Sequence, residues 1–486
     1  WLVAQGVPVV DTDLLARGGR TSFGGFLLRL GARMPFLFIA GRLYGAEALG
    51  LFAYATMVIE LMAQLATLGL KRGLAAELAE GSMPEPQIVA DALLLAWIAA
   101  ALGARLLVAV PGIVYPNGGG GGFDRILPLM AVAIVTSDVA IAAMAFRNRL
   151  GVAVVARSVV EPWTLAIVAL ALAFTPLKRD GLLIAYAASM VTAMIASLRP
   201  LLREFGWPSG WVPHWRRLFE LARANLPLAG ADAAEWGSRR LDIFILGRFA
   251  SAEVVGIYFI AQQIATLPGK LKSSFDSILA PVVARTLAVG DTSGVAAHIR
   301  QVGFWIAAAQ LGAGLALGFT GAASLALFGP SFATGVGVLA LLLLVEFLGA
   351  QASISETALI YLRRNANLAL SVAGLLLQTA ISLWLVPIYG GVGAAAGLAV
   401  ASLFLAITKS ALLKRVLATP VLGWRLSLLA AALPAVLVRI LVERLHGLVQ
   451  LVVGVPLVLG VFSAAIWTIG FRGPDRLLFT RGKGLG

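Results

Sequence analysis

Apolar residues fill this chain in continuous runs and do not alternate with polar ones. Most runs are about twenty residues long and are separated by short polar or glycine-containing segments. They span residues 22–41, 49–69, 89–114, 126–146, 151–175, 182–201, 221–248, 252–280, 302–328, 333–359, 367–388, 392–412, 426–445 and 449–471. A helix needs about 20 apolar residues to cross a bilayer, whereas a membrane β-strand alternates with period two. The pattern therefore predicts an all-α integral membrane protein with about fourteen transmembrane helices.

Composition agrees with the bilayer as the main solvent. The chain is 60% hydrophobic and 13% charged, with a mean hydropathy of +0.92, against about 45–50% and 25% in a soluble globule. Cysteine is absent, which excludes disulfides and thiolate metal sites. The three histidines, His214, His298 and His446, lie far apart in sequence, so we expect no metal site. The net charge of +14 indicates basic cytoplasmic loops rather than a nucleic acid partner.

The basic residues also predict an orientation. If the N-terminus is cytoplasmic, 26 Lys and Arg residues lie at the cytoplasmic ends of the runs and 7 at the opposite ends. This asymmetry follows the positive-inside rule and predicts that both termini are cytoplasmic. The linker Arg203–Leu218 then faces the cytoplasm, and the glycine run Gly118–Gly122 faces outward. We interpret Glu77, Glu80 and Glu85 as parts of a solvated loop.

An internal repeat divides the chain. Residues 37–56 and 243–262 are identical at eight of twenty positions with an offset of 206 residues. Six apolar runs separate the copies, so both copies start on the same side of the membrane. Parallel repeats of this kind build the two lobes of many transporters. We therefore expect two six-helix lobes, related by a parallel pseudo-two-fold repeat, plus two extra C-terminal helices.

The repeat also gives boundaries for the parts of the chain. Residues 1–202 are the expected N-terminal lobe and 203–219 the cytoplasmic linker. Residues 220–415 are the expected C-terminal lobe, and 416–486 hold the two additional helices with a cytoplasmic tail.

Two stretches resemble a known family. The first runs from Arg29 to Gly73 and contains Gly-Arg-Leu-Tyr-Gly-Ala-Glu-Ala-Leu-Gly-Leu-Phe, with Leu-Gly-Leu at 68–70; the second contains Asp242–Gly247 and Glu253–Tyr258. Both are similar to Wzx-type polysaccharide flippases of the multidrug/oligosaccharidyl-lipid/polysaccharide (MOP) exporter superfamily. The resemblance covers the first twelve predicted helices. It implies two lobes around a cationic cavity and a place in the bacterial cytoplasmic (inner) membrane.

The resemblance further implies a flippase that moves polyprenyl-diphosphate-linked oligosaccharide by alternating access. Its product would serve surface polysaccharide synthesis, such as lipopolysaccharide O-antigen, capsule or exopolysaccharide. The implied partners are the lipid-linked oligosaccharide, membrane lipids, and the polysaccharide polymerase and chain-length machinery. We expect no enzyme activity and no cofactor beyond a coupling proton or sodium ion. The two extra helices are similar to those of lipid II flippases.

Arginines inside predicted helices are the candidates for substrate binding, because a charge at the bilayer centre costs about 2.5–3.5 kcal/mol and calls for a compensating partner. They are Arg29, Arg33, Arg239 and Arg240. Arg29 and Arg33 lie four residues apart, hence on one helix face. The repeat offset relates Arg33 to Arg239 and places them at matching depths in the two lobes. The alternative is that these arginines extend to the headgroups.

Six acidic residues are candidates for binding a coupling ion. They are Glu60, Asp138, Glu161, Glu235, Asp242 and Glu346. Glu161 precedes Pro162, which frees a backbone carbonyl one turn earlier. Alternatively, Asp242 neutralises Arg239, and the mid-helix acids pair with an Arg or Gln of a neighbouring helix.

Rival functions remain open at this point. A lipid II flippase or a MATE-type drug exporter would have the same fold. A membrane-embedded glycosyltransferase, polymerase or ligase would need a sizeable outer loop with acidic residues, and no predicted outer loop exceeds about fifteen residues. A channel is disfavoured because no filter-like segment recurs.

Overall fold

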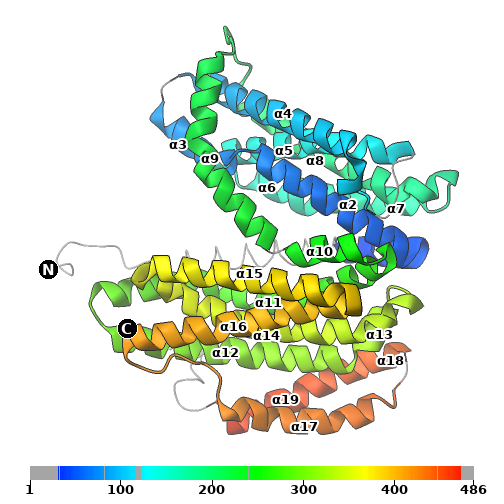
Figure 1. Cartoon of the computed structure of the whole chain (residues 1–486), viewed down its shortest axis with the longest axis vertical. Helices are drawn as coiled ribbons and strands as arrows, with labels where there is room; N and C mark the ends of the chain where they lie inside the picture. The colour runs from blue at the N-terminus through cyan, green and yellow to red at the C-terminus, as the bar shows by residue number, and fades with distance from the viewer. Residues whose placement is uncertain are drawn as a thin grey trace. The chain divides into compact units, whose positions relative to one another are not determined.

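The computed structural model describes residues 31, 33–81, 83–116, 122–238, 240–445 and 447–471, with the side chains of 233–236, 238, 271 and 273–278 excepted. Regular structure in these residues is helical throughout (Figure 1). Ten of the described helical segments are long and apolar enough to cross a membrane, and Leu426–Val442 is a shorter apolar helix. An all-α membrane protein is therefore confirmed, while the number fourteen stays a prediction.

The chain divides into two compact units, Trp1–Phe244 and Ile245–Gly486. The lobe boundaries expected from the repeat stay a prediction. The α-helices of more than ten residues in the first unit are α2 (Gly45–Ala66), α3 (Leu70–Glu80), α4 (Glu85–Ala109), α5 (Met130–Phe146), α7 (Glu161–Leu172), α8 (Gly181–Phe205) and α9 (Trp215–Ser238). Its shorter segments are η2 (Ala40–Tyr44), η3 (Pro111–Ile113), η4 (Gly122–Arg125), η5 (Leu127–Leu129), α6 (Gly151–Val154), η6 (Val155–Val160) and η7 (Pro176–Asp180).

The boundary between the units falls inside α10 (Leu241–Phe249). The second unit then contains α11 (Ala252–Ala288), α12 (Thr292–Phe319), α13 (Gly321–Ala326), η8 (Pro330–Gly335), α14 (Val336–Leu362), α15 (Arg364–Tyr389), α16 (Gly391–Leu417), α17 (Leu426–Val442), α18 (Gly447–Val449), η9 (Gln450–Gly454) and α19 (Val455–Ile469). At about 1.5 Å per residue, α11 is roughly 55 Å long and exceeds a hydrocarbon core of about 30 Å.

The segment after the second apolar run differs from its prediction. We expected a solvated loop at Glu77, Glu80 and Glu85, but Leu70–Glu80 forms α3 and Glu85 begins α4. Glu85 also forms an ion pair with Arg147 at 2.5 Å. Leu70, Leu74 and Leu78 are the buried leucines of α3, and their spacing of four places them on one helix face. This short amphipathic helix was missed because its apolar stripe is too brief to count as a transmembrane run.

Both copies of the repeat contain a break at the same position. In the first copy the chain turns at Gly45, the first residue of α2, whose φ of 87° lies in the left-handed region. In the second copy α10 ends at Phe249, and the hydroxyl of Ser251 accepts a hydrogen bond from the Val254 N–H at the start of α11. Gly45 and Ser251 are 206 residues apart, the offset of the repeat. Each copy is therefore a helix, a break and a second helix.

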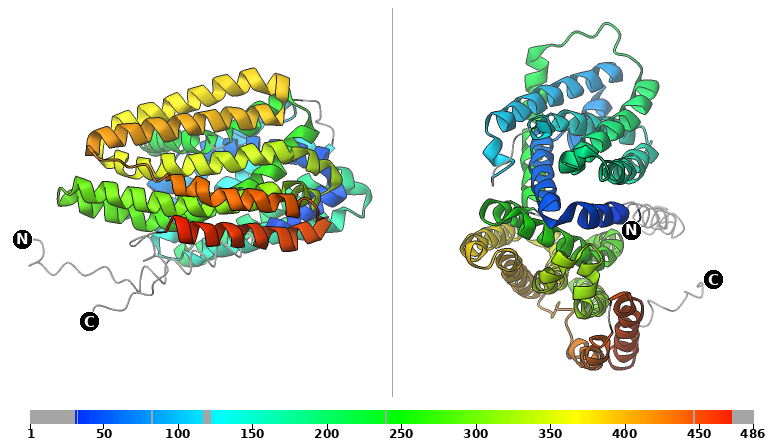
Figure 2. Two further views of the ribbon diagram at one scale, coloured as in Figure 1. Left: turned by 90° about the horizontal axis from the view of Figure 1, so that it is seen from below. Right: turned by 90° about the vertical axis from the view of Figure 1, so that its right-hand side faces the viewer.

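The C-terminal helices are packed onto the second unit. Helices α17 and α19 lie side by side and both contact α12 (Figure 1 and Figure 2). A buried apolar cluster joins Phe304, Ala307, Ala308 and Ala316 of α12 to residues of both added helices, among them Leu428, Ala431, Phe462 and Ile466. These helices thus cover an apolar face of α12 instead of projecting separately into lipid.

Candidate functional site

The first unit holds a network of charged side chains on its membrane helices. Asp138 of α5 accepts two cations: Arg157 pairs with its Oδ1, and Lys71 Nζ of α3 lies 2.8 Å from its Oδ2. Lys71 also donates to Gln64 Oε1 of α2 at 2.5 Å. The Asp138 side chain is only 11% exposed. In the apolar surroundings of these helices its charge has to be compensated, and the two cations do so.

Arg157 links this aspartate to a second acid. Its Nη1 lies 2.8 Å from Glu161 Oε2, one turn further along the same helix. Arg157 belongs to η6, a π-helical segment that directly precedes Glu161 and Pro162. Pro162 has no N–H for the preceding turn, and π-helical segments are frequent at functional sites. The helix is therefore π-helical over Val155–Val160, directly before Glu161, and this segment carries Arg157.

Glu60 of α2 lies beside the same network. Arg33, Arg157 and Arg240 act on it as positive charges, and Glu161 acts on it as a negative charge. No hydrogen bond or ion pair joins Glu60 to another of the described residues. Glu60 therefore differs from Asp138 and Glu161, which are both held by direct contacts to cations.

The structure describes only two of the four arginines that were predicted to bind substrate. Arg29 and Arg239 lie outside the described residues. Arg33 is exposed and Arg240 is half-buried, and both act electrostatically on Glu60. Arg240 is fixed by the backbone at the start of α10, where its N–H bonds Gly237 O at 3.0 Å and its carbonyl accepts from Phe244 N–H at 3.1 Å. Two of the predicted binding arginines therefore lie near one acid within the first unit.

The remaining acidic candidates lie elsewhere. The side chain of Glu235 is outside the described residues. Asp242 of α10 is buried, at 1% exposure. Glu346 of α14 lies in the second unit against the backbone of α11, where a Cβ at Gly269 would overlap its carboxylate. The positive charges that act on Glu346 are those of Lys270 and Lys272. The six predicted acids thus do not form one cluster.

Sequence reasoning missed two members of the network. Lys71 and Arg157 were counted among the basic residues at cytoplasmic ends, yet both contact Asp138. One signal was available, because Arg157 and Glu161 have the spacing of four that brings side chains together on a helix. The contact with Asp138 depends on how α5 packs in the fold and has no local signature.

The second unit contains a separate buried cation. Lys409 of α16 is 2% exposed; its Nζ lies 2.8 Å from Glu356 Oε2 of α14 and 2.9 Å from Ser371 Oγ of α15. Asn367 Nδ2 donates to the other Glu356 oxygen at 3.2 Å. These contacts join α14, α15 and α16, so we interpret Lys409 and Glu356 as a structural ion pair that stabilises the packing of the three helices.

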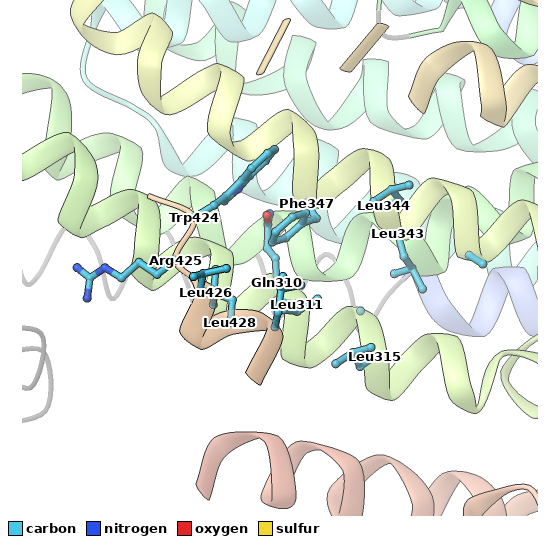
Figure 3. Close-up of a pocket in the computed structure, with 13 residues that line it drawn as sticks. Gln310, Leu311, Leu315, Leu343, Leu344, Phe347, Trp424, Arg425, Leu426 and Leu428 are labelled. Carbon is cyan, nitrogen blue, oxygen red and sulfur yellow. The ribbon is translucent and has the colours of Figure 1, made fainter. Parts of the chain in front are cut away.

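A mostly apolar cavity of about 540 Å³ lies in the second unit between α12, α14 and the start of α17 (Figure 3). Phe347 and Trp424 stack at its wall with ring centroids 5.4 Å apart. The carboxamide of Gln310 has no hydrogen-bond partner among the described residues. Arg425 lines the cavity and lies over the Phe304 ring, 4.0 Å from its centroid.

Comparison with solved structures gives several similar folds. A lipid II flippase MurJ in an inward closed conformation is 12% identical, with a TM-score of 0.72 over 92% of this chain and 99% of that chain. An inward-facing multidrug resistance MATE family transporter of the MOP superfamily is 15% identical, with a TM-score of 0.62 over 81% and 98%. A MOP superfamily transporter from Pyrococcus furiosus is 16% identical, with a TM-score of 0.56 over 83% and 95%.

Comparison of sequences gives the family. No curated protein matches this chain. The profile of the family described as "Polysaccharide biosynthesis protein" matches residues 21–287, which is more than half of the chain. The resemblance to a polysaccharide flippase is therefore confirmed. The chain belongs to the polysaccharide biosynthesis protein family, and it has the fold seen in the solved MurJ and MATE structures.

Proposed function

We propose that this protein flips polyprenyl-diphosphate-linked oligosaccharide across the bacterial cytoplasmic membrane by alternating access. The flipped glycan would serve O-antigen, capsule or exopolysaccharide synthesis. The observation that carries the proposal is the charged network of the first unit, in which Lys71 and Arg157 contact Asp138. Arg33 and Arg240 act electrostatically on Glu60 in the same unit. The family match, which names polysaccharide biosynthesis, supports the substrate class.

The arginines suit the part of the substrate that does not vary. Every lipid-linked glycan of this class carries a diphosphate, whereas its sugars differ. A guanidinium binds phosphate through two parallel hydrogen bonds and stays charged at any physiological pH. At about 4 Å and an effective dielectric of 20, one such contact is worth roughly 4 kcal/mol before desolvation. Two arginines can therefore hold the diphosphate while the glycan remains interchangeable.

The apolar cavity of the second unit is our candidate for contact with the polyprenyl tail. Its wall is built mainly from leucines of α12, α14 and α17, together with Phe347 and Trp424. Tail burial would add an apolar contribution that is independent of the glycan. The added helix α17 would then contribute part of the tail site.

A lipid II flippase is the second candidate, favoured by the high coverage of the MurJ fold. A MATE-type drug exporter shares the fold at a lower TM-score. Both alternatives predict a different accumulated or exported compound, so substrate analysis separates the three.

Complementation of a deletion strain with point variants tests the role of the arginines. Arg33→Ala and Arg240→Ala should each abolish surface glycan at normal protein levels, and the Lys variants should restore part of it. Arg105 of the membrane helix α4 is exposed like Arg33 but is not among the charges that act on Glu60, so it provides the control: Arg105→Ala should complement fully. Full complementation by the Arg33→Ala/Arg240→Ala double variant would show that these arginines are headgroup anchors.

The proposed orientation places both termini in the cytoplasm. The absence of native cysteine allows single cysteines to be introduced directly at 120 and 210. In intact cells an impermeant thiol reagent should label position 120 and leave position 210 unlabelled. Labelling at position 210 alone would show that the chain has the opposite orientation in the membrane. The polymerase and chain-length machinery remain proposed partners, and a proton or a sodium ion the proposed coupling ion.

A further inference from the structure

The linker Arg203–Leu218 folds back onto the first unit before it leads into α9 (Figure 1). It turns at Gly206 and Gly210, whose φ values of 76° and 67° lie in the left-handed region that favours glycine. Between the turn and α9, Gln87 Nε2 of α4 donates a hydrogen bond to the Ser209 carbonyl at 3.1 Å. The linker backbone is therefore tied to the start of α4.

A buried carboxylate of α4 fastens the linker further. Asp91 is 2% exposed. Its Oδ1 accepts a hydrogen bond from Trp211 Nε1 of the linker at 2.8 Å, and its Oδ2 lies 2.9 Å from Arg217 Nε at the start of α9. Removal of either contact would leave a buried carboxylate oxygen uncompensated, which is costly. The linker and the first turn of α9 are therefore held in fixed positions on the first unit.

This fixed segment presents large apolar side chains on its surface. Trp207, Val212, Trp215 and Phe219 are 64–79% exposed. Trp215 and Phe219 are four residues apart, so they lie on one face of α9. Because the backbone is held by α4, these side chains cannot turn inward to bury themselves. Their exposure to water is unfavourable, and an apolar environment outside the first unit would relieve it.

Two arginines lie beside the aromatic face of α9. Arg216 and Arg223 are seven residues apart and share a face of the helix, next to that of Trp215 and Phe219. Both are exposed. Arg216 Nε lies 3.1 Å from Glu220 Oε1, and Arg223 has no ion pair among the described residues. The linker patch consists of Trp207, Val212, Trp215, Arg216, Phe219 and Arg223.

We propose that the linker patch binds the headgroup layer of an anionic phospholipid surface. Tryptophan is enriched at membrane interfaces, because its ring is apolar and its N–H is polar. A guanidinium pairs well with lipid phosphate, and anionic lipids attract basic residues close to the membrane surface. The patch thus combines the two side-chain types that an anionic headgroup layer favours.

The position of the patch in the chain supports lipid as its partner. Helix α8 is part of a segment that is long and apolar enough to cross a membrane and ends at Phe205. Trp207 follows two residues later, so the patch begins where that segment would leave the hydrocarbon layer. The predicted orientation places it at the cytoplasmic leaflet, whose surface potential is negative. The inference does not depend on which substrate the protein carries.

Lipid contact can be measured with single fluorescent labels, because the chain has no native cysteine. Val212→Cys and Phe219→Cys are labelled with a nitrobenzoxadiazole dye in the full chain, reconstituted in nanodiscs. Val289→Cys is the control, since Val289 is 79% exposed and follows α11, which is longer than the hydrocarbon core is thick. Phospholipid with a nitroxide on its headgroup should quench the dye several-fold more at 212 and 219 than at 289. A water-soluble nitroxide should give the reverse order.

The role of the arginines is measured with the label at 212. In neutral phosphatidylcholine nanodiscs, trace nitroxide-labelled phosphatidylglycerol is compared with trace nitroxide-labelled phosphatidylcholine. One basic residue at a membrane surface favours anionic lipid by about 1 kcal/mol, or roughly fivefold. Phosphatidylglycerol should therefore quench several-fold more strongly at low salt, and Arg216→Gln/Arg223→Gln should bring the two lipids close to equality. Lys414→Gln/Arg415→Gln, which removes two exposed basic residues at the end of α16, should keep the preference.

Two results would overturn the proposal. Labels at 212 and 219 that are quenched from water as strongly as the label at 289, or that are shielded from both quenchers, would show that lipid does not cover the patch. Equal quenching by the two lipids in the chain that carries both arginines would contradict recognition of anionic headgroups. Neither result depends on the folding of an arginine variant, and neither bears on the proposed substrate.

Discussion

Removing Arg157 should destabilise the first unit because two carboxylates would lose a shared cation. The guanidinium pairs with Asp138 and lies 2.8 Å from Glu161, and the three side chains are only 22%, 11% and 27% exposed. Breaking a buried ion pair by deleting one partner costs about 3–5 kcal/mol. Lys71 stays 2.8 Å from Asp138 and the Glu161 carboxylate is partly screened, so about 3 kcal/mol is expected for Arg157→Met.

The cause of that cost can be separated from lost packing. Methionine keeps much of the unbranched stem, and the triple variant Arg157→Met/Asp138→Asn/Glu161→Gln removes the stranded negative charges. Replacement of a whole ionic group is often close to neutral, so the triple variant should recover most of the loss. Lys71 would still donate to Gln64.

Thermal unfolding in nanodiscs, followed by tryptophan fluorescence, measures the effect. Arg157→Met should melt several degrees below the wild type, and the triple variant should melt close to it. Equal melting of the wild type and Arg157→Met would refute the compensating role of Arg157. A triple variant as unstable as the single one would show that packing of the arginine stem, rather than stranded charge, carries the cost.

Three further predictions concern other parts of the chain. Gly73→Ala should loosen α9 from α3, because the new Cβ would overlap Asn225 Oδ1; faster hydrogen exchange confined to these helices checks this. Gly314→Phe should fill the apolar cavity without a backbone clash and reduce glycan export, while Gly460→Phe, at an equally open position on α19, should not. Asp291 caps α12, and hydrogen bonds from the Gly294 N–H and the Ser293 hydroxyl lower its pKa below the usual range. Asp291→Ala should therefore lower the melting temperature at neutral pH, and the difference should fade as the pH falls through that lowered pKa.

Much of the fold is predictable from hydrophobicity alone. All fourteen apolar runs overlap helices of the described chain, because in lipid an apolar segment can satisfy its backbone only as a helix. The two copies of the repeat also share a local structure that was not predicted, since they break at Gly45 and Ser251. Helix α3 was not predicted, because four-residue spacing over eleven residues gives a weak signal beside twenty-residue runs.

The sequence indicated which acidic residues belong to the candidate site, but not which cations contact them. Charges inside apolar runs directed attention to Glu60, Asp138 and Glu161, because such charges are costly there. The cations that hold two of them, Lys71 and Arg157, looked like ordinary residues of basic helix ends. Which acid is paired depends on contacts between helices that are distant in sequence, and a single sequence contains no record of those contacts.

The location of the lipid-linked glycan in cells that lack this protein tests the proposed function most directly. After deletion of the gene in its host, the polyprenyl-diphosphate glycan should accumulate in the cytoplasmic leaflet, inaccessible to a glycan-modifying enzyme added to spheroplasts. Surface polysaccharide should be lost, and both effects should be reversed by the wild-type chain. Normal surface polysaccharide, or accumulation of the glycan in the outer leaflet, would contradict a flippase function for this substrate.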